Sequence, residues 1–140
     1  MFELPLDPQI TLQDTIQFNE LLIGCGAPIN EINIIRKHFS AVKGGRLALA
    51  APEATKISLL LPDVPLRTLD ALSSGPTSPD HSTVNDVREL LAKYDINAKL
   101  PPSVRAFFER ADLPESPGTR AGARLSFPSR RATSLSPSGA

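Results

Sequence analysis

Residues 30 to 46 read Asn-Glu-Ile-Asn-Ile-Ile-Arg-Lys-His-Phe-Ser-Ala-Val-Lys-Gly-Gly-Arg, and they carry the clearest structural signal in the chain. The pattern predicts one amphipathic helix with a sharp end. Asn30 is a suitable N-cap, because its side chain can accept a hydrogen bond from an N–H of the first turn. Glu31 follows where the helix dipole favours an anion. Gly44 and Gly45 predict the end, since glycine adopts the left-handed C′ conformation without a Cβ clash.

The predicted helix has two different faces. At about 100° per residue, an apolar face forms from Ile32, Ile35, Phe39 and Val42. The adjacent face holds cations and hydrogen-bonding groups with no carboxylate: Asn33, Arg36, Lys37, Ser40 and Lys43.

The polar face has two readings. Spacing alone favours a face exposed to solvent. The glycine pair could instead offer backbone N–H groups to an anion, and a second predicted helix, residues 46–51, would add a positive N-terminus. A phosphate or carboxylate site is therefore a hypothesis for this stretch.

Length and composition indicate one ordinary domain. The chain has 140 residues, 41% of them hydrophobic, and a formal net charge of zero. A neutral total argues against nucleic-acid binding by the folded part. The single cysteine, Cys25, excludes an intrachain disulfide and fits a reducing compartment. No apolar run approaches the roughly 20 residues of a membrane span, and no signal peptide is recognisable, so we expect a cytoplasmic protein that does not bind membranes.

Three more helices are predicted from caps and periodicity. Thr11 can cap the first, which runs through about Ile23. Its apolar side is made of Leu12, Ile16, Leu21, Leu22 and Ile23. Thr83 predicts the start of a helix over residues 84–94, with Val87, Leu90 and Leu91 facing inward. Pro101 and Pro102 predict a last helix over residues 103–111, with Val104, Phe107 and Phe108 inward.

Two further segments are predicted, a strand that makes the fold α/β and a disordered tail. The short apolar run over residues 57–61 is typical of a buried strand in a parallel sheet. Residues 116–140 are rich in Ser, Arg, Pro, Ala and Gly and contain four arginines and no acid. Such a segment buries too little apolar surface to offset its ordering entropy, so we expect a disordered tail after a domain of residues 1–115.

Asp63 lies two residues beyond the predicted strand. In open α/β sheets, ligands bind at the carboxyl ends of the strands. Asp63 could therefore hold Mg²⁺ or act as a base, and it could also simply cap a turn. A carboxylate, several cations and glycine-containing turns are the groups that phosphoryl transfer uses.

Three stretches together resemble one family. These are residues 30–46 with Ala48, residues 60–65 (Leu-Leu-Pro-Asp-Val-Pro) and residues 69–80 (Leu-Asp-Ala-Leu-Ser-Ser-Gly-Pro-Thr-Ser-Pro-Asp). In this order and spacing they resemble the glycerate 2-kinase family, whose members end in a MOFRL domain. The resemblance covers residues 4–115. It implies a Rossmann-like domain of a kinase that uses ATP and Mg²⁺ to phosphorylate D-glycerate on its 2-hydroxyl.

The resemblance also implies site residues. Arg36, Lys37, Ser40 and Lys43, with Gly44 and Gly45, match the family's Arg-Lys-His-Leu-Ser…Lys-Gly-Gly motif, and Phe39 stands in place of its leucine. Asp63 matches the acid of its Ser-Asp-Val-Pro motif, and Ser74, Gly75, Thr77 and Asp80 match the following loop. The implied roles are anion neutralisation by Arg36, Lys37 and Lys43, metal or proton chemistry at Asp63, and ligand contacts from Ser40 and the two glycine turns. Pro62 replaces a common serine and Leu66-Arg67 a common Gly-Asp, and both changes bear on metal binding near Asp63.

Some relatives carry a hydroxypyruvate reductase label, but no dinucleotide fingerprint occurs in this sequence. The family has a Gly-Gly-Gly-Ser segment before the matched part and a long remainder after it, so we expect a fragment that is not competent alone. Its expected partners are a small hydroxy acid, a nucleotide and the remainder of the kinase chain. The rival hypotheses are a non-catalytic α/β module that binds an anion or a partner, and a poorly folded product without function.

Overall fold

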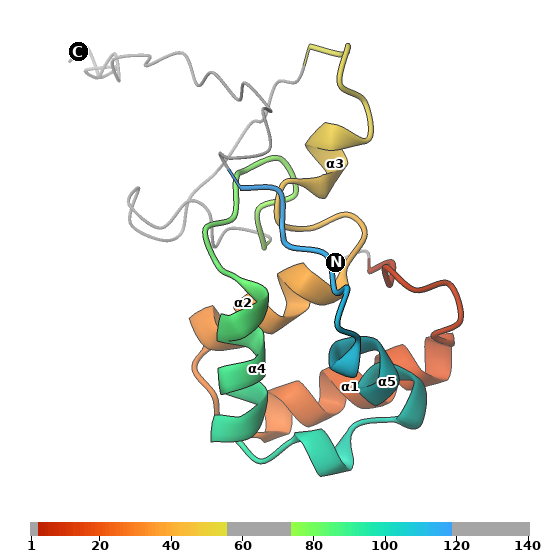
Figure 1. Ribbon diagram of the computed structural model, residues 1–140, viewed down its shortest axis with the longest axis vertical. Helices are drawn as coiled ribbons and strands as arrows, with labels where there is room; N and C mark the ends of the chain where they lie inside the picture. The colour runs from red at the N-terminus through yellow and green to blue at the C-terminus, as the bar shows by residue number, and fades with distance from the viewer. Residues whose placement is uncertain (1–2, 56–73, 119–140) are drawn as a thin grey trace, which may run out of the picture.

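The computed structural model describes residues 3–55 and 74–118, and the described part is helical (Figure 1). Its elements are α1 (Leu12–Gly24), α2 (Ile29–Phe39), α3 (Arg46–Leu49), α4 (Val84–Lys93), the 3₁₀ turn η2 (Asn97–Lys99) and α5 (Pro102–Glu109). Helix α2 packs against α4, and α1 packs against α5. In Figure 1 these four helices form one body, and α3 lies apart from it.

Two helix starts confirm the predicted caps. The Thr11 hydroxyl accepts a hydrogen bond from the Asp14 N–H at 3.1 Å, and the Asp14 carboxylate accepts one from the Thr11 N–H. Thr83 and Asp86 form the same reciprocal arrangement at the start of α4. Each such capping box satisfies two backbone donors that the first turn leaves unpaired. Helix α5 begins with Pro102 in its first turn, where the missing N–H has no cost.

The predicted helix over residues 30–43 is wrong at both ends. Helix α2 begins after Pro28 without a side-chain cap, so Asn30 is not the N-cap. It ends at Phe39, because Ser40 is extended and forms an antiparallel bridge with Pro5. The Leu6 N–H donates to the Phe39 carbonyl at 2.9 Å, and the Ala41 N–H donates to the Leu4 carbonyl at 2.7 Å. These bonds to a distant segment terminate the helix, and they place Lys43 outside it.

Aromatic side chains form the centre of the core. Phe18 of α1 and Phe39 of α2 have ring centroids 4.4 Å apart, and both are fully buried. Phe107 and Phe108 of α5 join them, with Phe39 and Phe107 edge to face at 6.0 Å. Burying one such side chain contributes about 1.5–3 kcal/mol. The predicted inward residues of α4 and α5 are all buried, as expected.

The predicted apolar side of α1 is right for Leu22, which is buried, and for Leu21, which packs against the core, but wrong for the other three residues. Leu12, Ile16 and Ile23 are 77%, 42% and 69% exposed, whereas Thr15, Phe18 and Leu22 are buried. A threonine fits the buried face because its hydroxyl donates to the Thr11 carbonyl at 2.9 Å and is therefore satisfied.

Several predictions concern residues outside those described. The strand over residues 57–61 and Asp63 lie there, and residues 3–55 and 74–118 contain no named strand. Most of the predicted tail, residues 119–140, also lies outside. The predicted boundary after residue 115 falls within a packed segment, because Ser116 and Pro117 are buried. Within the described ranges, no helix has the length and apolar character to cross a membrane.

Candidate functional site

Two turns that lie 30 residues apart in the sequence are joined by their backbones. The Gly44 N–H donates to the Ser74 carbonyl at 3.1 Å. The Gly45 N–H donates to the Gly75 carbonyl at 2.8 Å. All four residues have positive φ, including Ser74 at 60°, where a non-glycine residue is uncommon. We call this pair of turns, with Lys37, Asp80 and Ser116 packed against it, the turn junction.

Close packing explains the glycines of the turn junction. A Cβ on Gly44 would lie 3.3 Å from the Lys37 Cβ and 3.3 Å from the Ser116 Oγ. A Cβ on Gly45 would lie 3.0 Å from the Ser78 carbonyl oxygen. Both positions therefore favour glycine for two reasons: the backbone is left-handed, and a Cβ would crowd these neighbours.

Lys37 and Asp80 form a buried ion pair in the turn junction. The Lys37 Nζ lies 3.3 Å from Asp80 Oδ1, and the two residues are 5% and 4% exposed. Burial by itself would raise the pKa of Asp80, but the charge of Lys37 and hydrogen bonds from Ser116 and Ser82 outweigh it and lower that pKa. The Ser82 hydroxyl lies 2.8 Å from the Asp80 carboxylate. The pair holds the 74–80 loop onto α2.

Lys43 is also paired with a carboxylate. It is 4% exposed, and its ammonium donates to the carboxylate of Glu3 in the N-terminal segment. The reading of Lys37 and Lys43 as part of a solvent-exposed face is therefore wrong. The expectation that no carboxylate would neutralise them is also wrong, because Glu3 and Asp80 come from outside the helix.

The other predicted site residues have separate places. Arg36 Nε donates to the Asn19 side chain of α1 at 3.1 Å, so this cation faces α1. The buried Ser40 hydroxyl accepts from the N–H groups of Val42 and Lys43, which turns the chain after α2. Thr77 is half-buried in the 74–80 loop. Asp63 lies outside the described residues.

The backbone N–H groups around Gly44 and Gly45 are used internally. Besides the two bonds between the turns, the Arg46 N–H donates to the Lys43 carbonyl and the Leu47 N–H to the Val42 carbonyl. The predicted helix over residues 46–51 is the four-residue α3, with Gly45 as its N-cap. The hypothesis that this turn holds an anion through free backbone N–H groups is therefore wrong.

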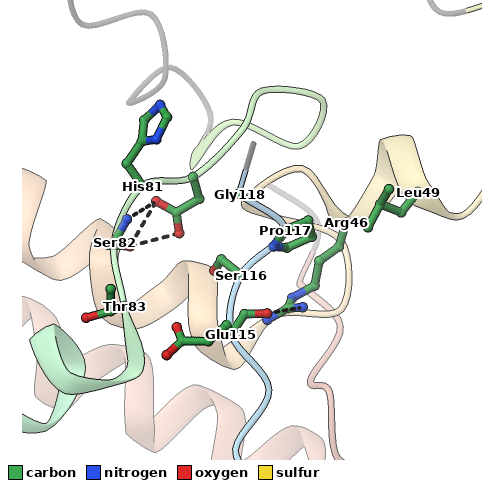
Figure 2. A pocket seen from close by; sticks show the side chains of 10 residues that line it. Arg46, Leu49, His81, Ser82, Thr83, Glu115, Ser116, Pro117 and Gly118 are labelled. Atoms are coloured by element: carbon green, nitrogen blue, oxygen red, sulfur yellow. Dashed lines mark hydrogen bonds between the residues drawn. The ribbon is translucent and has the colours of Figure 1, made fainter. Parts of the chain in front are cut away.

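A cleft of about 860 Å³ opens beside the turn junction (Figure 2). Its walls come from the start of α3, from the loop before α4 and from the segment after α5, and its polar side chains are Arg46, Asp80, His81, Ser82, Thr83, Glu115 and Ser116. Figure 2 shows Arg46 reaching across to the backbone at Glu115. The Arg46 guanidinium donates to the carbonyls of Pro114 and Glu115, both at 3.4 Å.

Arg46 has an unused donor in this cleft. Its Nε is buried and has no hydrogen-bond partner among the described residues. Burial lowers the pKa of Arg46, and the negative charge of Asp80 partly offsets that effect. An unsatisfied buried donor on a cation is a place where an anion would be stabilised.

His38 lies buried beneath the cleft. Its Nδ1 lies 3.1 Å from the Ile34 carbonyl, which can only accept, so Nδ1 carries the proton. Its Nε2 then faces the Ser116 hydroxyl at 3.5 Å and the Glu115 carboxylate at 3.6 Å. The described residues hold no group of three His, Cys, Asp or Glu side chains arranged for a metal ion.

Sequence reasoning did not select His38, Arg46, Glu3 or Ser116 as site residues. His38 and Arg46 stand inside the quoted 30–46 motif, so their place in the motif was the signal that could have found them. Glu3 lies 40 residues from its partner Lys43 in the sequence, and Ser116 lies 78 residues from its partner His38. No local sequence pattern marks either residue.

A family model described as "Domain of unknown function (DUF4147)" matches residues 1–109. The chain belongs to the DUF4147 family. The Pyrococcus horikoshii protein named glycerate 2-kinase is 46% identical over 110 residues, which are 79% of this chain and 24% of that protein. A crystal structure from Pyrococcus horikoshii OT3 superposes with a TM-score of 0.74 at 42% identity, over 84% of this chain and 27% of that chain.

A third relative bears a different name. An Agrobacterium vitis protein named as a candidate hydroxypyruvate reductase is 40% identical, over 81% of this chain and 26% of its own length. The resemblance to glycerate 2-kinases is confirmed by the family match and the names of several relatives. The chain spans about a quarter of the length of these relatives.

Proposed function

We propose that this chain carries part of the substrate and nucleotide cleft of a glycerate 2-kinase, which transfers a phosphoryl group from ATP to the 2-hydroxyl of D-glycerate. One observation carries the proposal. Two of the three stretches that resemble the family, residues 30–46 and the described part of residues 69–80, meet at the turn junction, where the Lys37–Asp80 pair lies buried beside an open cleft. Relatives with glycerate kinase names, 41–46% identical to this chain, support the same activity.

The cleft offers groups that suit an anionic ligand. Phosphoryl transfer depends on positioning and on neutralising charge, and bound ATP and Mg²⁺ supply the transferable group and part of that neutralisation. Arg46, which lines the cleft, would bind a phosphate or carboxylate oxygen through its guanidinium. Ser82 adds a hydroxyl from the loop before α4.

The two lysines serve first as internal counter-charges. Lys37 balances Asp80, and Lys43 balances Glu3, so each contributes little net positive potential at the cleft. A ligand must therefore either draw a lysine away from its carboxylate or rely on Arg46. We propose that this internal pairing, with the short span of the chain relative to its kinase relatives, leaves the chain unable to phosphorylate glycerate alone.

Two further parts of the proposal concern residues beyond those described. Asp63 would hold Mg²⁺ or manage the proton of the substrate hydroxyl. The run at residues 57–61 would form a strand of a parallel sheet whose partner strands come from the remainder of the kinase. Among the described residues, the Ser74–Gly75 turn and Thr77 stay in the proposal as ligand contacts, although none of them lines the cleft and Ser74 and Gly75 are buried.

The direct test has two arms. The purified 140-residue chain is incubated with MgATP and D-glycerate, beside a control that carries Asp63→Ala, and we expect no turnover above the control. The Pyrococcus horikoshii glycerate 2-kinase is then given alanine at the residues aligned with Lys37 and Lys43. We expect phosphoryl transfer to fall strongly, because charge-stabilising groups contribute about 3–4 kcal/mol in such sites.

The carboxylate pairing of both lysines favours one other candidate, a non-catalytic module in which they only stabilise the fold. Unchanged turnover of the doubly substituted enzyme would support that candidate and contradict the proposed catalytic role.

A further inference from the structure

Helix α1 presents large apolar side chains to solvent. Leu12, Ile16 and Ile23 are 77%, 42% and 69% exposed, and their spacing of four and seven residues places them on one stripe. Large apolar residues that gather on one face, rather than scattering singly, mark a contact surface.

The stripe forms one wall of a groove. The groove has a volume of about 590 Å³ and runs between α1 and the N-terminal segment, where Glu3, Pro5 and Ile10 form the opposite wall. We call it the α1 groove. The buried face of α1, with Thr15, Phe18 and Leu22, already packs in the core, and α1 lies against α5 in Figure 1. The three residues of the stripe lie outside the hydrophobic core formed by the described residues.

We propose that the α1 groove receives an apolar segment of the same enzyme, from the part of a glycerate kinase that lies outside the region matched here. We choose this occupant because the chain is much shorter than its relatives. The chain corresponds to 24% of the Pyrococcus glycerate 2-kinase and 27% of the crystallised Pyrococcus chain, so about three quarters of either relative has no counterpart here. A surface that the intact enzyme covers would be exposed in this chain.

Charge around the groove favours a segment of the same enzyme, rather than a second copy of this chain, as its occupant. The exposed Glu20 lines the groove between Ile16 and Ile23, and the last turn of α1 contains no basic residue. A second copy packed through the same stripe would bring a further carboxylate and no Lys or Arg, because α1 contains neither. The occupant is therefore a segment with an apolar stripe and a Lys or Arg at its edge. The inference rests on membership of the family and not on the catalytic proposal.

The first test is a measurement on the crystallised Pyrococcus chain. The exposed fraction of the residues aligned with Leu12, Ile16 and Ile23 is calculated in the full chain, and again after removal of everything outside the matched region. We expect these residues to be buried in the full chain and exposed after removal. Exposure in the full chain, or burial by a second copy alone, would overturn the inference.

The second test compares thermal unfolding in two backgrounds. Leu12→Ser, Ile16→Ser and Ile23→Ser are combined in this chain, and the aligned residues are changed in the Pyrococcus glycerate 2-kinase. We expect the unfolding midpoint to stay within about 2 °C in this chain and to fall by more than about 5 °C in the full-length enzyme. Equal shifts in both backgrounds would contradict the inference.

Three controls make the comparison specific. Gln13→Ser with Gln17→Ser changes exposed α1 positions and should shift neither midpoint beyond the helix-propensity effect. Leu22→Ser changes the core and should lower both midpoints. Sedimentation of this chain should show a monomer. A dimer that the triple substitution dissociates would assign the groove to a second copy and overturn the proposal.

Discussion

The helical core and the turn junction hold the chain together in different ways. In the core, four phenylalanines from α1, α2 and α5 contact one another through non-directional packing. In the turn junction, a few groups meet through directional bonds, two left-handed turns and one buried ion pair. A core of this kind tolerates apolar exchanges of similar volume. The turn junction is less tolerant, because its hydrogen bonds and ion pair need particular groups, and a Cβ on Gly44 or Gly45 would crowd its neighbours.

The largest loss of stability is expected from the centre of the core. Phe39→Ala removes the ring that contacts Phe18, Phe107 and Phe108, and should cost about 3–5 kcal/mol of the free energy of unfolding. Urea unfolding followed by circular dichroism measures it. Phe39→Leu should recover most of the loss, since it keeps apolar volume. Equal losses for both variants would mean that aromatic geometry, and not packing volume, stabilises the core.

The glycines of the turn junction come next. Gly44→Ala should cost more than the roughly 1–2 kcal/mol of a left-handed alanine, because the new Cβ would also crowd Lys37 and Ser116. Gly26 is the matched control, since its φ is +81° but nothing lies within 4 Å of its Cβ position. The difference in unfolding free energy between the two variants isolates the crowding. No difference would show that the junction packs more loosely than described.

The Lys37–Asp80 pair predicts a specific dependence on pH. The pKa of Asp80 in the folded chain lies below its ordinary value of 3.8. Its contribution to stability is therefore fully present above pH 3.8 and is lost as pH falls through the lower folded pKa. Asp80→Asn should lower the free energy of unfolding at neutral pH. It should also make that free energy decrease less steeply as the pH falls below 4.

Asp112→Asn is the control for this effect. Its carboxylate also has a lowered pKa, owing to Arg110, but it lies exposed on the surface. Thermal unfolding between pH 2.5 and 7 compares the two variants. A steeper acid effect for Asp112 than for Asp80 would contradict the importance of the buried pair.

The smallest effect is expected at the surface contact between α2 and α4. Lys93 and Tyr94 both donate to the Glu31 carboxylate, at 2.9 and 2.8 Å, but Lys93 is largely exposed. Lys93→Ala should therefore lower the unfolding midpoint less than Phe39→Ala, Gly44→Ala or Asp80→Asn, and less in 0.5 M salt than at low salt. A decrease in the unfolding midpoint as large as that of Gly44→Ala would mean that this surface contact stabilises the fold as much as the turn junction does.

The same contrast explains what the sequence could predict. The starts of α1 and α4 were predictable, because each capping box lies within four residues of sequence. The end of α2 was not, because it depends on backbone bonds from Leu4 and Leu6. The predicted apolar side of α1 mixed the buried Leu22 with the exposed Leu12, Ile16 and Ile23, since an apolar residue looks the same in the sequence whether it faces the core or a surface groove.

The candidate site divides in the same way. The resemblance marked Lys37, Lys43 and both glycine turns, and the structure brings all of these except Lys43 into one junction. The carboxylates that pair the lysines could not be predicted, because Glu3 and Asp80 lie 40 and 43 residues from their partners. Arg36 and Lys37 are neighbours in one motif, yet one faces α1 and the other the turn junction.

That pair of neighbours gives the most direct test of the claim that the turn junction belongs to a phosphoryl-transfer site. In the Pyrococcus horikoshii glycerate 2-kinase, methionine is placed singly at the residues aligned with Lys37 and Arg36, and kcat for D-glycerate is measured with thermal unfolding as a check on folding. The account predicts that kcat falls about 100-fold or more at the Lys37 position and less than about threefold at the Arg36 position. Equal effects at the two positions, or unchanged turnover at the Lys37 position, would contradict it.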